Sequence, residues 1–351
     1  MKIIKDELTA LTQKYGDERR TQVVPTGLGE FKEEDLVPQE EAIITLSAGG
    51  YIRRLPPNTF KTQGRGGKGL IGSDVSEEDF LTHFLAGKTH DNLLFFTNKG
   101  RVFQTKIYDI PPGSRTAKGR AIHNFLEMPT GEEVSAIIAY SNDKKIANAS
   151  LIMVTAQGVV KRTALADFKN IRRNGIIAIA LKKGDSLKDV RLSSGNSQIL
   201  IVTSAGQSVR FRESQARLMG RNAAGTRGIR LKKGDQVAGF DIVQEDEKEK
   251  SKEGRVLVVM ANGFGKQTRL KEYKVQNRGG SGIRTANITA KTGRLIAAKI
   301  ITDETEILTL SAKGQVIRTA LAGVRETGRS AQGVRIMNLR PGDRLAGLVV
   351  I

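Results

Sequence analysis

The sequence predicts an all-β protein in which six four-stranded blades surround a common axis, after a short helix. One unit recurs six times across residues 41–351, at a period of about 50 residues that is typical of a repeat architecture. Each unit holds about four short apolar runs separated by polar turns, with no amphipathic helical pattern between them. A lone four-stranded sheet leaves an edge and a face exposed, so the units are expected to form a propeller-like ring.

The predicted helix lies at the start of the chain. Apolar residues recur there with the spacing of one helix face, at Ile3, Ile4, Leu8, Leu11 and Tyr15. Residues 1–24 are therefore expected to be a helical segment. Residues 25–40 combine Pro and Gly with an acidic excess, which indicates an acidic linker, and residues 41–351 form the predicted ring.

Each repeat begins with a hairpin signature. A β-rich run such as LLFFT or ILIVT leads into a polar turn that ends in glycine, and a second run such as VVKRTAL follows. These turn glycines number the repeats 1 to 6: Gly50, Gly100, Gly158, Gly206, Gly263 and Gly314. A second glycine follows small or basic residues in each repeat, at positions 69, 119, 175, 228, 282 and 333. In four repeats a Gly-Asp or Gly-Glu turn then precedes the last apolar run.

The net charge favours a polyanionic partner. The chain has 57 Lys and Arg against 37 Asp and Glu, a formal net charge of +20. Residues 1–40 are acidic on balance, so residues 41–351 carry +23. Such a surplus is typical of nucleic-acid binding, and a basic protein that is merely soluble is the plain alternative.

Several function classes are not expected. The chain has no cysteine, which excludes disulfides, thiolate nucleophiles and cysteine-bound zinc. The histidines His83, His90 and His123 share no metal-ligand spacing, so we expect no metal site and no cofactor. No apolar run approaches the roughly 20 residues of a membrane helix, and the first residues are too polar for a signal peptide. We expect a soluble, intracellular protein that, by itself, is not an enzyme.

The stretch KTQGRGGKGLIG, residues 61–72, combines glycines with positive charges. It contains GxGxxG, but no helical pattern follows Gly69, and Lys68 is followed by Gly69 where a P-loop has Ser or Thr. Nucleotide binding is therefore not expected. Arg65 and Lys68 recur at the same offset from the second glycine in other repeats, as Arg115, Lys118, Arg278 and Arg329. Basic loops on successive blades would place positive charge around the rim, where bare glycine amides admit a phosphate.

The run QGRGGKG, residues 63–69, is very similar to the seven-residue box QRRGGKG of DNA gyrase A C-terminal domains. Gln63, Arg65, Gly66, Gly67, Lys68 and Gly69 match the box, and Gly64 stands where a basic residue is common. The opening KYGDERRTQVV also looks like the end of the gyrase A breakage and reunion region. Box, opening segment and repeats together cover essentially the whole chain.

The resemblance implies a six-bladed β-pinwheel whose blades exchange strands and around whose rim duplex DNA is bent and wrapped without sequence specificity. In a whole gyrase this wrap presents a segment for strand passage in ATP-dependent negative supercoiling, and the implied partners are the remaining part of gyrase A together with gyrase B. The implied location is the bacterial cytoplasm, on the chromosome, and the isolated domain is expected to be monomeric. The box is implied to matter more for wrapping than for binding.

Two alternatives remain at the sequence level. A topoisomerase IV C-terminal domain is related but lacks an intact box. A propeller scaffold that binds acidic proteins would gather its cations on one flat face instead of the circumference.

The expected DNA contacts are the box, residues 63–69, and a set of cations on the rim. Four of the cations stand four residues after a turn glycine, and four lie before a second glycine: Arg54, Arg162, Arg210 and Arg318, then Arg115, Lys118, Arg278 and Arg329.

Overall fold

The structure is a computed structural model that describes residues 2–17, 36–56, 81–114, 117–141, 146, 148–169, 171–244, 254–313 and 315–350. The chain divides into two units, Met1–Pro38 and Gln39–Ile351. The first contains the predicted helix, α1 (Lys2–Tyr15), whose residues are all exposed. None of the helices in the described ranges has the length and apolar character of a transmembrane span.

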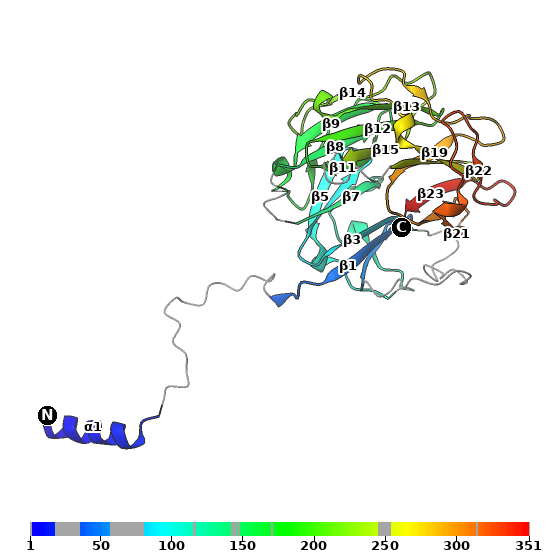
Figure 1. Cartoon of the computed structure of the whole chain (residues 1–351). Coiled ribbons are helices and arrows are strands. Elements are labelled where there is room, and N and C mark those ends of the chain that lie inside the picture. The colour runs from blue at the N-terminus through cyan, green and yellow to red at the C-terminus, as the bar shows by residue number, and fades with distance from the viewer. Residues whose placement is uncertain are drawn as a thin grey trace. The chain divides into compact units, whose positions relative to one another are not determined.

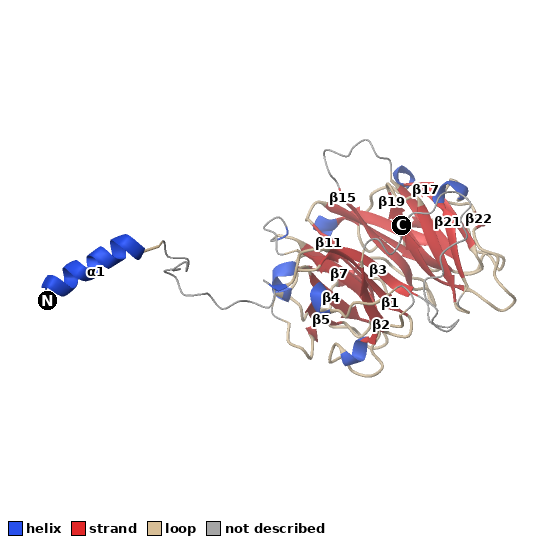
Figure 2. Ribbon diagram, turned by 90° about the horizontal axis from the view of Figure 1, so that it is seen from below, coloured by secondary structure: helices blue, strands red, loops and turns tan. Residues whose placement is uncertain are grey.

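The second unit consists of six antiparallel sheets arranged around an axis (Figures 1 and 2). This confirms the predicted six-bladed fold. From axis to rim, the strands are as follows: blade 1, β3 (Leu81–Lys88), β1 (Glu41–Ser47), β2 (Tyr51–Leu55) and β6 (Arg120–Ala121); blade 2, β7 (Val134–Tyr140), β4 (Asn92–Thr97), β5 (Arg101–Lys106) and β10 (Ile176–Ile177); blade 3, β11 (Leu187–Ser193), β8 (Ser150–Thr155), β9 (Val159–Ala164) and β14 (Thr226–Arg227); blade 4, β15 (Val237–Gln244), β12 (Ser197–Thr203), β13 (Gln207–Arg212) and β18 (Ile283–Arg284); blade 5, β19 (Leu295–Ile301), β16 (Arg255–Met260), β17 (Phe264–Arg269) and β22 (Val334–Arg335); and, among the described residues of blade 6, β23 (Leu345–Val350), β20 (Glu306–Ser311) and β21 (Val316–Ala320).

The innermost strands line the axis. The strands β3, β7, β11, β15, β19 and β23 contact one another in this order, and β23 contacts β3. Blades 1 and 6 are therefore neighbours, and the innermost strands form a complete circle.

The outermost strand of blades 1 to 5 comes from the following repeat. In blade 1, for example, β6 lies after β5 in the chain but pairs with β2, where Arg120 is opposite Ile52. In blade 5, β22 pairs with β17, and Val334 is opposite Gly265. We call these two-residue strands exchange strands, and the segment before each one an exchange loop. Each exchange strand joins two successive repeats, so neighbouring blades are held by main-chain hydrogen bonds.

Among the described residues, glycine recurs at two places in the repeats, at the hairpin turn and directly before the exchange strand. The described turn glycines have positive φ angles, which only glycine adopts readily, and Gly314 lies outside the described residues. The glycine immediately before each exchange strand also has a positive φ, at Gly119, Gly175, Gly225, Gly282 and Gly333. A Cβ on Gly282 would lie 2.3 Å from the carbonyl oxygen of Ser208. In repeat 4 this position is Gly225, and the sequence alignment on Gly228 was wrong because Gly228 lies beyond the strand.

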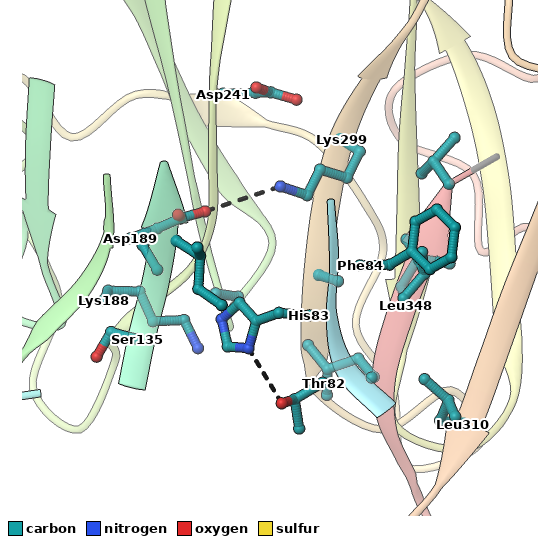
Figure 3. A pocket seen from close by; sticks show the side chains of 18 of the residues that line it. Thr82, His83, Phe84, Ser135, Lys188, Asp189, Asp241, Lys299, Leu310 and Leu348 are labelled. Atoms are coloured by element: carbon teal, nitrogen blue, oxygen red, sulfur yellow. Dashed lines mark hydrogen bonds and ion pairs between the residues drawn. The ribbon is translucent and has the colours of Figure 1, made fainter. Parts of the chain in front are cut away.

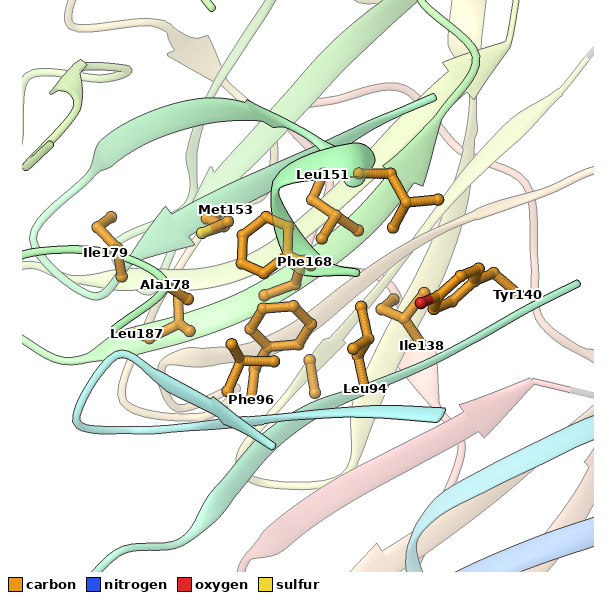
Figure 4. Close-up of a cluster of buried hydrophobic side chains, with 14 of the residues drawn as sticks. Leu94, Phe96, Ile138, Tyr140, Leu151, Met153, Phe168, Ala178, Ile179 and Leu187 are labelled. Carbon is orange, nitrogen blue, oxygen red and sulfur yellow. The ribbon is translucent and has the colours of Figure 1, made fainter. Parts of the chain in front are cut away.

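The hydrophobic core lies between the faces of adjacent blades. Between blades 2 and 3, Leu94 and Phe96 on β4 pack with Leu151 and Met153 on β8 (Figure 4). Phe96 also meets Phe168 edge to face, with ring centroids 6.2 Å apart. Each β-rich run is almost continuously apolar because both faces of an inner strand are covered by neighbouring blades.

Candidate nucleic-acid interface

The exchange strands bring a series of exposed arginines to the rim. In repeats 4 to 6 the second residue of the strand is an exposed arginine, Arg227, Arg284 and Arg335, and in repeat 2 the first residue is Arg120. None of these four residues was among the contacts predicted from the sequence. Arg227, Arg284 and Arg335 stand two residues after the second glycine when repeat 4 is aligned on Gly225, and Arg120 stands one residue after it. This spacing was a usable signal in the sequence.

The exchange loops add further exposed cations. Lys118, which was predicted as a contact, is exposed, and its Nζ lies 4.2 Å from the ring centroid of Tyr51. Arg172 and Arg173 are exposed in the loop before β10, and Arg217 is exposed in the loop before β14. Positive side chains therefore recur on successive blades.

The rim loops are also bonded to one another. Arg278 donates from Nε to the carbonyl oxygen of Gln215 at 3.1 Å and from Nη1 to that of Arg227 on the preceding exchange strand. Arg329 donates from Nη1 to the carbonyl oxygen of Arg284 at 3.1 Å. Both predicted residues are half-buried and connect each basic loop to the previous one.

The cations four residues after the turn glycines have partners within the protein. Arg162 on β9 lies 3.5 Å from buried Glu213, and Arg318 on β21 donates from Nε to Glu306 at 2.8 Å. Arg210 on β13 donates from Nη1 to the carbonyl oxygen of Leu270 at 3.0 Å.

Three of these positions connect neighbouring blades. Glu213 begins the 3-10 turn η7 (Glu213–Gln215), and Leu270 begins η8 (Leu270–Glu272), so Arg162 and Arg210 each reach the following blade. At the equivalent position, Gln267 donates to the carbonyl oxygens of Leu321, in η9 (Leu321–Gly323), and Val324. The long polar side chain four residues after the turn glycine therefore indicates a contact between blades at these three positions. A phosphate contact by Arg162, Arg210 or Arg318 stays a prediction.

The remaining predicted residues divide into two groups. Arg54 on β2 is half-buried, and its main-chain N–H donates to the carbonyl oxygen of Pro111 in the exchange loop at 3.0 Å. Arg115 and the box, residues 63–69, lie outside the described residues. Their roles stay predictions.

The axis has a different electrostatic character from the rim. The pocket there is lined by the innermost strands and contains a network of paired charges (Figure 3). Asp189 pairs with Arg191 at 2.7 Å and with Lys299 at 3.7 Å, and Arg191 also reaches Asp241 at 3.3 Å.

Burial shifts the pKa of two groups in this pocket. Burial raises the pKa of Asp241, although Arg191 and a main-chain hydrogen bond from Ile300 oppose the shift. Burial also lowers the pKa of His83 in the same pocket. Paired charges join blades 3, 4 and 5 at the axis, and the described residues that line the pocket carry no surplus of cations comparable to that on the rim. Among the described residues, no group of His, Asp and Glu side chains could hold a metal ion.

Six segments of the chain match the family model described as the DNA gyrase C-terminal domain, beta-propeller: residues 41–87, 91–141, 149–194, 197–244, 256–302 and 305–351. The chain is 43% identical over 343 residues to the DNA gyrase A protein of Staphylococcus epidermidis, covering 98% of this chain and 38% of that protein. It is 42% identical over 339 residues to the DNA gyrase A protein of Staphylococcus aureus, with coverage of 97% and 38%. The chain thus spans little more than a third of the length of these relatives.

Two solved structures share the fold. A structure of a DNA gyrase A C-terminal domain has a TM-score of 0.72 and 27% identity, and the match covers 89% of this chain and 99% of that one. A crystal structure of the C-terminal domain of a DNA topoisomerase IV has a TM-score of 0.73 and 24% identity, with coverage of 90% and 94%. The second similarity concerns the fold alone.

Proposed function

The chain belongs to the family of DNA gyrase A C-terminal domains, and on that premise we propose that its rim binds duplex DNA and bends it around the ring. The observation that carries this proposal is the series of exposed arginines on the exchange strands, Arg120, Arg227, Arg284 and Arg335. Guanidinium groups spaced along a curved perimeter suit phosphates of a curved duplex. Contacts of this kind read no base sequence.

The surplus of positive charge on residues 41–351 is large enough to offset the free energy of bending DNA. Bending a site of about 20 to 30 base pairs by about 40 to 90° costs roughly 1 to 6 kcal/mol, so a longer wrap costs several times as much. Residues 41–351 carry a surplus of +23, which spreads over six blades. Each neutralised phosphate releases bound counterions, and many such contacts together offset the bending cost.

Within a whole enzyme, the proposed role is to present DNA for strand passage. We propose that this domain works with the remaining part of a gyrase A protein and with gyrase B, which supply strand cleavage and ATP hydrolysis for negative supercoiling. In this proposal the chain wraps the DNA, and the catalytic groups belong to the other parts of the enzyme. Residues 63–69 are proposed to support wrapping more than binding.

The alternatives predict other results. A topoisomerase IV tail would bend DNA weakly and would not depend on residues 63–69. A scaffold for acidic proteins would carry its cations on one flat face, whereas Arg227, Arg284 and Arg335 lie on the outermost strands of blades 3, 4 and 5. Their position favours DNA wrapping.

The direct test of the interface removes the three equivalent arginines together, as Arg227→Gln, Arg284→Gln and Arg335→Gln. The logarithm of the binding constant for duplex DNA is measured against the logarithm of salt concentration. The slope should become shallower by about 0.9 for each lost phosphate contact. Lys188→Gln, which removes an exposed charge at the axis pocket, is the control and should leave the slope unchanged. An unchanged slope in the triple variant would contradict the proposed interface.

A further inference from the structure

Three buried cations lie directly beneath exchange loops. Arg53 on β2, Lys161 on β9 and Lys266 on β17 occupy the same position of the third strand in blades 1, 3 and 5, and they are at most 3% exposed. Their cross-strand partners are equivalent residues in the three sheets. The same position is apolar in the other blades, with Phe103, Val209 and Ile317.

The buried cations donate to main-chain carbonyl oxygens of the exchange loops. Lys266 Nζ lies 2.8 Å from the carbonyl oxygen of Gly328 and 2.6 Å from that of Arg329. Lys161 Nζ donates to the carbonyl oxygen of Arg221 in the loop before β14. It also donates, at 2.7 Å, to the carbonyl oxygen of Ala178, which directly follows the exchange strand β10.

Arg53 makes the equivalent contact in blade 1. Its Nη1 donates to the carbonyl oxygen of Ala117, immediately before Lys118. In all three blades, therefore, a buried cation holds the main chain of a loop that presents basic side chains.

The stems of the three side chains also pack against the glycines that precede the exchange strands. A Cβ on Gly225 would lie 3.1 Å from the Cβ of Lys161, and one on Gly333 would lie 3.1 Å from the Cβ of Lys266. Each lysine side chain thus packs against the glycine before the exchange strand and extends to the carbonyl oxygens of the exchange loop. The exchange strand that follows carries Arg227 in blade 3 and Arg335 in blade 5.

We propose that Lys161, Lys266 and Arg53 are positioning residues for DNA wrapping, which hold the exchange loops so that the exposed arginines keep a fixed spacing along the rim. This inference rests on the proposed function. The three buried cations themselves do not reach solvent, so they act through the loops and not by direct contact with phosphate. A hydrogen bond from a charged donor to a buried carbonyl is stronger than a neutral one, and its loss leaves that carbonyl unpaired.

The test compares Lys161→Met and Lys266→Met, alone and together, with Lys161→Arg and Lys266→Arg. Methionine keeps the apolar stem but cannot donate, whereas arginine already performs the same contact at Arg53 in blade 1. Lys188→Met at the axis pocket is the matched control for loss of a lysine. Thermal melting identifies the variants that fold. If the double variant does not fold, the two single variants are compared instead, because each of them changes only one blade.

Three readouts separate the positioning role from a general structural role. Amide hydrogen exchange of residues 217–227 and 325–335 should become faster in the methionine variants. The linking-number shift of ligated nicked circles should fall by about half or more, because a loosened support misplaces the contact groups. Affinity for linear duplex should stay within about threefold, with an unchanged salt slope, because no surface charge is lost. The arginine variants should match the unmodified chain in all three.

Folded methionine variants with unchanged loop exchange would overturn the proposal. It would also be overturned by an undiminished linking-number shift in these variants, or by arginine variants that fail in the same way. If the unmodified chain itself shifts no linking number, the proposed function fails, whereas the exchange rates of the loops still report whether the buried cations hold them.

Discussion

Glu213 lies 3.5 Å from the Nε atom of Arg162, so that a fully buried carboxylate of blade 4 pairs with a guanidinium of blade 3. At the equivalent position of blade 6, Arg318 pairs with Glu306, but both side chains there are about 30% exposed and belong to the same blade. The chain thus contains a buried inter-blade pair and an exposed intra-blade pair built on the same strand position.

The two pairs should differ sharply in their effect on stability. Glu213→Gln leaves Arg162 without its buried counter-charge and should lower the free energy of unfolding by about 3 kcal/mol. Glu306→Gln should cost less than about 1 kcal/mol, because water screens an exposed pair. Urea denaturation of both variants measures the difference. Equal losses would show that Glu213 does not connect the two blades energetically.

The glycine before an exchange strand should be irreplaceable, whereas a glycine in the same loop should not be. Gly225 has a φ of +85°, and a Cβ there would lie 2.7 Å from the carbonyl oxygen of Val160. Gly225→Ala should therefore destabilise the protein by more than about 1 kcal/mol. Gly220 has no heavy atom within 4 Å of a built Cβ, so Gly220→Ala should be neutral or slightly stabilising. Melting temperatures of the two variants decide the question, and a neutral Gly225→Ala would rule out the close approach.

The buried lysines predict a pH dependence of stability. Burial lowers the pKa of Lys161 and of Lys266 to about 8, from an ordinary value of 10.5. Between these two values the unfolded chain binds more protons than the folded chain, so this contribution to the unfolding free energy rises with pH and is lost as the pH falls through 8.

Comparison with an always-charged side chain isolates this effect from other titrations. The melting temperature of the unmodified chain, relative to that of the Lys161→Arg and Lys266→Arg double variant, should rise from about pH 7.5 to about pH 9.5, because arginine stays protonated throughout. A difference that stays constant or falls with pH would contradict the assigned burial of the two amines.

The box at residues 63–69 should affect wrapping and binding differently. Replacing these residues by alanine should abolish the linking-number shift while leaving affinity for duplex DNA within about tenfold, because the other rim cations remain. Filter binding and ligation of nicked circles, carried out on the same variant, provide the two measurements. A proportional loss of both activities would remove the separate role of the box.

The blades were predictable because their signals are local. An apolar run, a polar turn and a turn glycine such as Gly100 or Gly206 specify a hairpin within about a dozen residues. The number of blades needed no longer-range information than the repetition itself. The exchange strands are different, because two residues such as Ile283 and Arg284 have no periodicity of their own, and the strand they pair with comes from another repeat.

The candidate site was only partly predictable, for a related reason. Arg162 and Arg210 have the same length and charge as a rim cation, and the sequence does not indicate whether such a side chain faces water or the next blade. Arg227 was missed because repeat 4 was aligned on Gly228, three residues beyond Gly225. Arg284 and Arg335 follow correctly aligned glycines, but a two-residue strand has no pattern that shows it lies on the rim. The buried role of Lys161 and Lys266 was also missed, since lysine is rarely buried without a partner.

The central claim is that the cations on the perimeter curve a duplex around the ring. Ligation of nicked circular DNA in the presence of increasing amounts of this chain, followed by measurement of linking number, tests it most directly. We expect a shift of one consistent sign that grows with protein and is reduced in the Arg227→Gln, Arg284→Gln and Arg335→Gln triple variant. Saturating binding with an unchanged linking number would contradict the claim.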